Sequence, residues 1–355
     1  MYKLALIISC IILISACKKD NVPGIDSTPY VLDYGIFPTP NISSDNSLTI
    51  AGVALGRKLF YDTKFSKDGT MTCGSCHQQS NAFSDTTLFS IGVEGLPGKR
   101  QSMAIFNMAW HTNEFFWDGR AHLLRDQSLT PIEDALELNE TLENVINKLK
   151  ADNSYEEMFT KAFGSEDINS LKISLALEQF MLTIISNQSK YDKYLAGSAS
   201  LSQNELNGME LFFAEYNPFF PSESGADCAH CHSSFNFEND LYMNNGLDTD
   251  VNITDLGRYE ATLDINDKGK FKVPSLRNIA FTPPYMHDGR FATLEEVVAH
   301  YNSGIMTSNT VDPTVQNTQA TGLMLSAQDK ADLVAFLHTL SDYQFTTDLK
   351  FSDPN

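Results

Sequence analysis

The stretch that decides the fold is Cys73-Gly74-Ser75-Cys76-His77, and a second string of the same form follows in the other half of the chain, Cys228-Ala229-His230-Cys231-His232. In such a string, two thiols separated by two residues can bond to the two vinyl groups on one edge of a porphyrin. The histidine that follows can bind the iron as its proximal ligand. The strings therefore predict two covalently bound c-type haems.

Two other readings of these cysteines fit less well. A zinc site built from four cysteines usually has its two pairs closer in sequence, whereas 151 residues separate Cys76 from Cys228. A thioredoxin-like redox pair would not need a histidine at the next position in both strings.

The beginning of the chain predicts export. Lys3 precedes an apolar run from Leu4 to Ile14, which is shorter than the ~20 residues of a membrane-spanning helix. The run ends in Ile14-Ser15-Ala16-Cys17, which resembles a bacterial lipobox. That resemblance implies removal of residues 1–16, acylation of Cys17 and a location in the periplasm or cell envelope. Membrane contact would then be through this lipid anchor alone. A plain signal peptide with an incidental cysteine is the alternative.

Cysteine count and charge limit the other possibilities. With Cys10 in the signal and Cys17 lipidated, all four remaining cysteines belong to the haem strings, so we expect no structural disulfide. The formal charge of −20 becomes −21 when Lys3 leaves with the signal. Such a surface repels nucleic acid and favours positively charged protein partners, although it can also serve solubility alone.

Matching landmarks around the two haem strings predict an internal duplication. A helix end, Leu55–Tyr61 or Asn207–Phe213, precedes each string, and an Asp-Gly-Arg turn, at 118–120 or 288–290, follows it. We predict an all-α, loop-rich fold of two cytochrome c-like haem domains. The predicted division is a flexible tether at 17–45, an N-terminal haem domain at 46–200, a C-terminal haem domain at 201–345 and a tail at 346–355.

Local patterns support the helical prediction. Three pairs fit a capping box, in which Ser or Thr caps an amide and an acid reaches back; they are Ser202 with Glu205, Thr293 with Glu296 and, more weakly, Ser326 with Asp329. Apolar residues at helical spacing predict helices over 171–185 and 333–340.

From about Leu48 to Leu340 the chain resembles the bacterial dihaem cytochrome c peroxidases and the related MauG-type enzymes. Besides the haem strings, the resemblance rests on Phe116-Trp117-Asp118-Gly119-Arg120, Pro274-Ser275-Leu276-Arg277-Asn278 and Pro284-Tyr285-Met286-His287-Asp288-Gly289. It implies a peroxide site at the N-terminal haem and electron entry at the C-terminal haem.

Three catalytic residues follow from the resemblance. Gln127 and Glu137, 10 and 20 residues after Trp117, match the family's distal glutamine and glutamate. A carboxylate in a pocket can move a proton between the two oxygens of a peroxide, and an amide can orient it. Trp117 matches the tryptophan between the haems, where an oxidisable indole can carry charge. Packing alone is the other role open to Trp117.

The sequence departs from the peroxidase pattern at both irons. Many relatives carry a histidine that blocks the peroxide site at rest, but Val93 stands there, so we expect the first iron to be five-coordinate or water-bound. His111 or His122 could substitute. The second iron usually takes a methionine, whereas the matching position here is Tyr301, as in MauG-type enzymes. Met306 and Met324 are the competing ligands, and an open site is a further possibility.

The resemblance also implies a Ca²⁺ ion between the haems. Thr282 and Pro284 match its carbonyl donors, and Gln101 stands where an asparagine amide is usual. Relatives are often dimers, so a homodimer is an expectation by analogy.

Three functions are compatible with these features. The first is a hydrogen peroxide reductase that takes electrons from a small cytochrome c or cupredoxin. The second is a MauG-like oxidase that uses peroxide to oxidise a residue of a partner protein. The third is an electron-transfer cytochrome in which two protein ligands close each iron.

Overall fold

The computed structural model describes residues 24–112 and 114–354. The predicted signal at 1–16 and the predicted anchor Cys17 lie outside these residues. No helix within the described ranges is long and apolar enough to cross a membrane.

Helices and loops make up nearly all of the described chain, which confirms the prediction of a helical, loop-rich fold. The α-helices are α1 Ile50–Phe60, α2 Cys73–Cys76, α3 Leu124–Glu133, α4 Leu142–Lys150, α5 Asn153–Phe163, α6 Ser170–Thr183, α7 Lys190–Leu195, α8 Gln203–Phe213, α9 Tyr259–Thr262, α10 Leu294–Ser303, α11 Pro313–Gln316 and α12 Ala327–His338. The 3₁₀ turns are η1 Ser44–Asn46, η2 Thr63–Phe65, η3 Gln79–Asn81, η4 Met108–Trp110, η5 Pro221–Glu223, η6 Cys228–His230, η7 Ile265–Asp267, η8 Ile279–Phe281 and η9 Phe345–Thr347. A two-stranded antiparallel sheet pairs β1 Tyr242–Met243 with β2 Phe271–Lys272, and Tyr242 lies opposite Lys272.

The predicted helix signals are confirmed. The capping boxes at Ser202, Thr293 and Ser326 begin α8, α10 and α12. The two apolar stripes correspond to α6 and α12, and both helix ends predicted before the haem strings are present, in α1 and α8.

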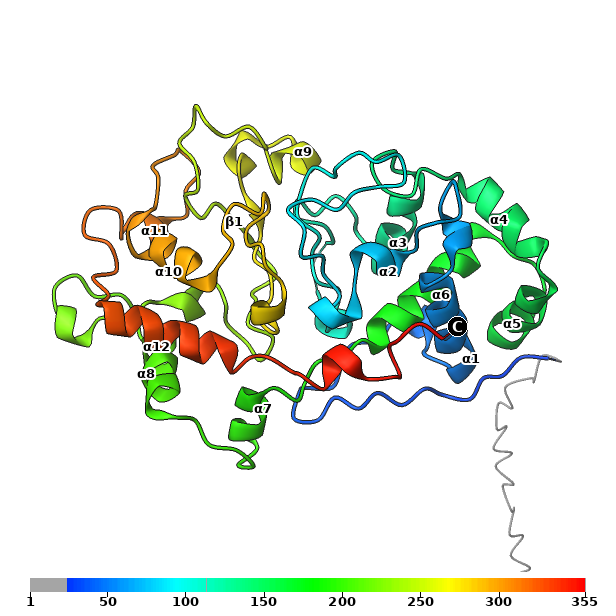
Figure 1. Cartoon of the computed structure of the whole chain (residues 1–355), viewed down its shortest axis with the longest axis horizontal. Coiled ribbons are helices and arrows are strands. Elements are labelled where there is room, and N and C mark those ends of the chain that lie inside the picture. The colour runs from blue at the N-terminus through cyan, green and yellow to red at the C-terminus, as the bar shows by residue number, and fades with distance from the viewer. Residues whose placement is uncertain (1–23, 113, 355) are drawn as a thin grey trace, which may run out of the picture.

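Two helical units lie side by side, one containing α1 to α6 and the other α7 to α12 (Figure 1). In each unit, the most extensive helix contact joins an early helix to a late one, α1 with α6 and α8 with α12. A glycine makes each contact possible, because a Cβ atom on Gly56 would lie 1.9 Å from the Ala176 carbonyl oxygen and one on Gly208 would lie 1.9 Å from that of Asp332. The two units therefore use the same device for close helix packing.

Each unit has its own hydrophobic core. The first core draws on residues between Val53 and Ile184 and also on Phe345 and Phe351 from the end of the chain. The second core runs from Tyr191 to Leu340. Since Tyr191 lies on α7, this helix packs with the second unit.

The C-terminal segment returns to the first unit (Figure 1). Phe345 and Phe351 contact the ring of Phe83, with ring centroids 5.6 and 6.3 Å apart. Arg57 donates to the Leu349 and Ser352 carbonyl oxygens, both at 2.7 Å. The end of the chain thus completes the core that the first residues begin.

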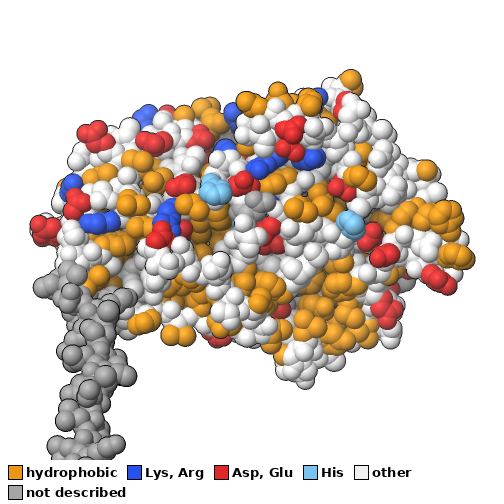
Figure 2. Space-filling view, turned by 180° about the vertical axis from the view of Figure 1, so that it is seen from behind, with side chains coloured by type: hydrophobic (Ala, Val, Ile, Leu, Met, Phe, Trp, Pro, Cys, Tyr) orange, Lys and Arg blue, Asp and Glu red, His pale blue; other side chains and the backbone are white. Residues whose placement is uncertain are grey.

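Acidic side chains are spread over the face shown in Figure 2 and do not gather in one patch on it. Hydrophobic side chains gather at the lower right of that face, on the side of the second unit.

Candidate functional site

The first string places its histidine by a local hydrogen bond. The four residues Cys73–Cys76 form α2, which begins with a capping box between Thr72 and Ser75. His77 follows the helix, and its Nδ1 donates to the Phe83 carbonyl oxygen at 3.1 Å. A carbonyl can only accept, so Nε2 keeps its lone pair. Burial lowers the pKa of His77, which favours the neutral form that binds iron.

The second string reaches the same arrangement with different local structure. Cys228 lies in η6, and Cys231 ends that turn. His232 Nδ1 donates to the Phe237 carbonyl oxygen at 3.1 Å. Burial lowers the pKa of His232 to about 4. Each string therefore offers a neutral imidazole whose Nε2 is available to a metal.

The residues around both strings fit a covalently bound haem. None of the four cysteines in the described chain forms a disulfide. A first cavity, of about 830 Å³, is lined by Cys76 and His77. A second cavity is lined by Cys228, Cys231 and His232, and its walls are mainly apolar. The paired thiols and the imidazole of each string are the donor set that a c-type haem requires, and the second cavity adds an apolar wall for the ring.

The first cavity brings together all three predicted catalytic residues. Gln127 comes from α3, Glu137 from the loop that follows α3, and Trp117 from the loop before it. Burial, with a smaller contribution from the negative charge of Asp134, raises the pKa of Glu137 to about 7, although the positive charge of Arg120 opposes the shift. Glu137 can therefore both hold and release a proton near neutral pH.

Val93 supports this site through its backbone. Its amide donates to the Glu137 carbonyl oxygen at 2.8 Å, and its side chain offers no atom that can bind iron. Of the two predicted substitutes, His122 is exposed, whereas His111 lines the first cavity. His111 Nδ1 lies near Glu238 and Asp240, at 3.4 and 3.2 Å from their carboxylate oxygens.

Trp117 lines both cavities. Its Nε1 donates to the Gln101 carbonyl oxygen at 2.8 Å, and its own carbonyl accepts from the Lys272 amide at 2.8 Å. The next residue, Asp118, is buried and pairs with Arg100 at 2.6 Å and with Arg120 at 3.0 Å. These bonds hold the indole between the two haem units.

Tyr301, on α10, lines the second cavity with Cys228, Cys231 and His232. Its hydroxyl oxygen accepts a hydrogen bond from Asn245 Nδ2 at 3.2 Å. Burial raises the pKa of Tyr301 to about 12. The competing candidates Met306 and Met324 are 49% and 37% exposed, and neither is among the residues that line this cavity.

Sequence reasoning missed two sulfur atoms and one amide at the second cavity. Met243 and Met286 both line it, and Asn245 Nδ2 lies 3.3 Å from the Met286 sulfur. Met286 stands inside the Pro-Tyr-Met-His-Asp-Gly string, so its position could have been inferred. No local pattern marks Asn245.

The three residues predicted to bind calcium also meet at the second cavity. The Gln101 side chain is buried, and its Nε2 donates to Ser84 Oγ at 3.1 Å and to the Asp85 carbonyl oxygen at 2.9 Å. These bonds fix the amide so that Oε1 remains as an acceptor. Among the described residues, no hydrogen bond engages the carbonyl oxygen of Thr282 or Pro284.

Comparisons with known proteins agree with this geometry. The family model described as di-haem cytochrome c peroxidase matches residues 50–200. The chain is 33% identical over 301 residues to the methylamine utilization protein MauG of Methylophilus methylotrophus, covering 83% of this chain and 84% of that protein. It is 35% identical over 247 residues to the cytochrome c551 peroxidase of Nitrosomonas europaea, covering 69% and 70%. A crystal structure of a MauG-like protein associated with microbial copper homeostasis superimposes with a TM-score of 0.79 at 35% identity, covering 91% of this chain and 98% of that one.

Proposed function

This chain belongs to the family of di-haem cytochrome c peroxidases and MauG proteins, and from that premise we propose that it reduces hydrogen peroxide to water in its first unit, with electrons that enter at the second unit from a small redox protein. The family implies two haems, and Cys73, Cys76, His77, Cys228, Cys231 and His232 would hold them. When bound, the haems supply iron that can exchange electrons with peroxide.

The observation that carries the proposal is the difference between the two cavities. The first combines a haem string with Gln127 and Glu137, whereas the second combines a haem string with Tyr301. Reduction of one peroxide to two waters consumes two electrons and two protons. Only the first cavity presents the predicted proton-transfer pair.

In the proposed mechanism, the Gln127 amide orients the peroxide by a hydrogen bond. The Glu137 carboxylate accepts a proton from one peroxide oxygen and returns it to the other, which then leaves as water. The raised pKa of Glu137 suits both steps. Trp117 provides an oxidisable indole shared by the two cavities, through which charge can pass.

Replacing Glu137 tests this proposal. Haem-loaded Glu137→Gln should lose about 10²–10⁴-fold in peroxide-dependent oxidation of a reduced small cytochrome c, the usual contribution of acid–base catalysis. Glu133→Gln is the matched control, because Glu133 is exposed at the end of α3 and does not line the cavity. Equal rates for the Glu137 variant and the native protein would refute the proposed role.

A MauG-like oxidase is the second candidate, favoured by Tyr301 and Val93 and by the similarity to MauG. Here a side chain of a partner protein would give up two electrons and two protons to one peroxide. Peroxide added without a donor discriminates the candidates by spectroscopy. A long-lived spectral change that only a protein partner discharges favours the oxidase, and rapid return with oxidation of a small redox protein favours the reductase.

The third candidate, a cytochrome without peroxide chemistry, requires that both irons be closed by protein ligands. Electron paramagnetic resonance of the purified ferric protein addresses it directly. A high-spin component indicates an open iron, as expected from Val93, and a spectrum without one would support the electron-transfer cytochrome.

We also propose that the two units arose by internal duplication, with the boundary between them before α7 and not between 200 and 201 as predicted, since α7 packs with the second unit. Matched features support this proposal, namely the packing of Gly56 and Gly208 and the bond from each proximal histidine to a phenylalanine carbonyl. Calcium binding by Gln101, Thr282 and Pro284 is proposed on the free acceptors described above.

Location and assembly are further parts of the proposal. Export to the periplasm or cell envelope and anchoring through Cys17 rest on the N-terminal sequence. Labelling with a radioactive fatty acid, lost in Cys17→Ser, tests the anchor. Sedimentation of the purified protein tests the homodimer.

A further inference from the structure

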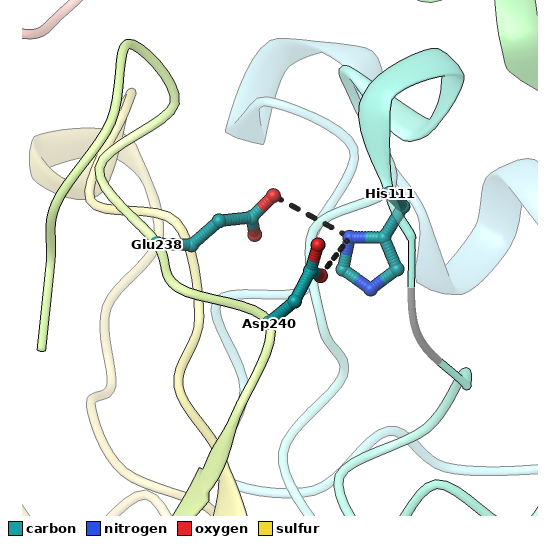
Figure 3. A group of neighbouring side chains, drawn as sticks. All are labelled: His111, Glu238 and Asp240. Atoms are coloured by element: carbon teal, nitrogen blue, oxygen red, sulfur yellow. Dashed lines mark ion pairs between the residues drawn. The ribbon is translucent and has the colours of Figure 1, made fainter. Parts of the chain in front are cut away.

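A group of buried side chains joins the two units at a point that the proposed mechanism does not use. His111 follows η4 in the first unit, while Glu238 and Asp240 lie between the second haem string and β1 (Figure 3). The three ligand atoms lie within 4.8 Å of one another. The side chains of His111, Glu238 and Asp240 are 6%, 8% and 18% exposed, so the group is largely shielded from bulk water.

The imidazole faces the two carboxylates without forming a hydrogen bond. His111 Nδ1 lies 3.4 Å from Glu238 Oε1 and 3.2 Å from Asp240 Oδ1, yet it makes no hydrogen bond with any described residue. Figure 3 shows both carboxylates directed at this one nitrogen atom. A buried nitrogen atom without a hydrogen bond is unusual, because buried polar atoms nearly always have a partner.

The two distances from His111 Nδ1 to the carboxylate oxygens match the ligand spacing of a four-coordinate metal. Zinc binds nitrogen and oxygen ligands at about 2.0–2.1 Å, and in a tetrahedron this places neighbouring ligands about 3.3–3.4 Å apart. One imidazole with two carboxylates is a donor set that suits zinc and other divalent transition metals.

Neighbouring bonds hold the two carboxylates in place. Asp240 Oδ2 accepts from the amide and the hydroxyl of Thr112, at 3.1 and 2.7 Å. Glu238 Oε1 accepts from Asn236 Nδ2 at 2.6 Å. Outer bonds of this kind orient metal ligands. Because His111 and Glu238 line the first cavity, an ion has a route to the group.

We propose that His111, Glu238 and Asp240 form a binding site for a divalent transition metal, with zinc as the ion that best fits it. The site is distinct from the predicted calcium residues, since it shares none of them. The ion links a loop of the first unit to a loop of the second, beside the segment that carries Trp117.

Lys272 gives the proposal a sharp test. Its Nζ lies 3.6 Å from Asp240 Oδ1 and makes no hydrogen bond with any described residue. A positive charge there repels a metal ion at the neighbouring carboxylates. Lys272→Met keeps most of the buried stem and should therefore tighten zinc binding, whereas a simple ion-pair network predicts no gain.

The experiment titrates zinc into the chelator-treated, haem-loaded protein by calorimetry, with calcium present in excess throughout. One equivalent should bind to the native protein and to His338→Ala, a control on the exposed surface of α12. His111→Ala and Glu238→Gln should bind more than about tenfold more weakly. Glu238→Gln retains an acceptor for Asn236, so it remains informative where His111→Ala fails to fold.

Anomalous diffraction at the zinc edge then locates the ion. A peak between the three side chains supports the site, as does tighter binding by Lys272→Met. Absence of stoichiometric binding to the native protein, or unchanged binding by a folded Glu238→Gln variant, overturns it. In that case the three side chains make only a polar contact between the two units. None of these readouts depends on peroxide turnover.

Discussion

Glu137 should lower the stability of the protein in order to serve its chemistry. Burial raises its pKa from the ordinary value of 4.5 to about 7. The unfolded chain releases this proton near pH 4.5, whereas the folded chain holds it until about pH 7. Stability is therefore lost as the pH rises between these values, and the loss is complete above pH 7.

The size of the effect follows from the two pKa values. At about 1.4 kcal/mol per pH unit, the difference corresponds to a penalty of about 3 kcal/mol at high pH. Glutamine is neutral at every pH and has nearly the same shape. Glu137→Gln should therefore unfold at higher urea concentration than the native protein at pH 8, by up to this free energy, and should match it near pH 4.5.

Urea denaturation of the haem-loaded protein, followed by far-ultraviolet circular dichroism at several pH values, measures this difference. The activity of the native protein should rise with pH through about 7, because in the proposed mechanism the ionised carboxylate accepts the proton from peroxide. Exposed Glu133→Gln provides the control, with no pH-dependent gain. A stability difference between Glu137→Gln and the native protein that does not change with pH would refute the reasoning.

Four further predictions address other parts of the molecule. Trp117→Phe should slow electron transfer between the units by more than about tenfold while both haem spectra stay native, and stopped-flow absorbance measures this rate. Gly56→Ala should lower the free energy of unfolding by about 1–3 kcal/mol, because the added methyl group forces two helices apart; Gly98→Ala, whose Cβ would meet nothing closer than 3.6 Å, should change it by much less. Tyr301→Phe should raise the reduction potential of the second haem if Tyr301 is the proposed ligand, because the change would remove a hard oxygen ligand that favours the oxidised iron, and a potentiometric titration that finds no shift counts against that role. Removal of calcium by a chelator should lower the melting temperature, and Gln101→Leu should abolish the response to added calcium.

The sequence could predict those parts of the fold that depend on residues close together in the chain. A capping box lies within four residues, so the starts of α8, α10 and α12 could be located. The haem strings are similarly local, and the bond from His77 to Phe83 spans only six residues. For the same reason, the strings sufficed to name the residues that are proposed to hold each haem.

The parts that could not be predicted depend on residues far apart in the chain. Glu238 and Asp240 contact His111 although more than 120 positions separate them in the chain. No sequence pattern in either segment indicates that the two segments meet. Asn245 reaches Tyr301 across 56 positions in the same way. Family resemblance supplied Gln127 and Glu137, since a lone glutamine and a lone glutamate after a helix carry no signal of their own.

The return of the last residues to the first unit bears on how the molecule matures. Phe83 supplies the carbonyl that fixes His77, and its ring packs against Phe345 and Phe351. A polypeptide that is still emerging has its first cysteine pair but not these two aromatic rings. The first imidazole would then gain its final support only once Phe345 and Phe351 have been made, so a chain cut short before Phe345 would carry the attachment string without its native setting.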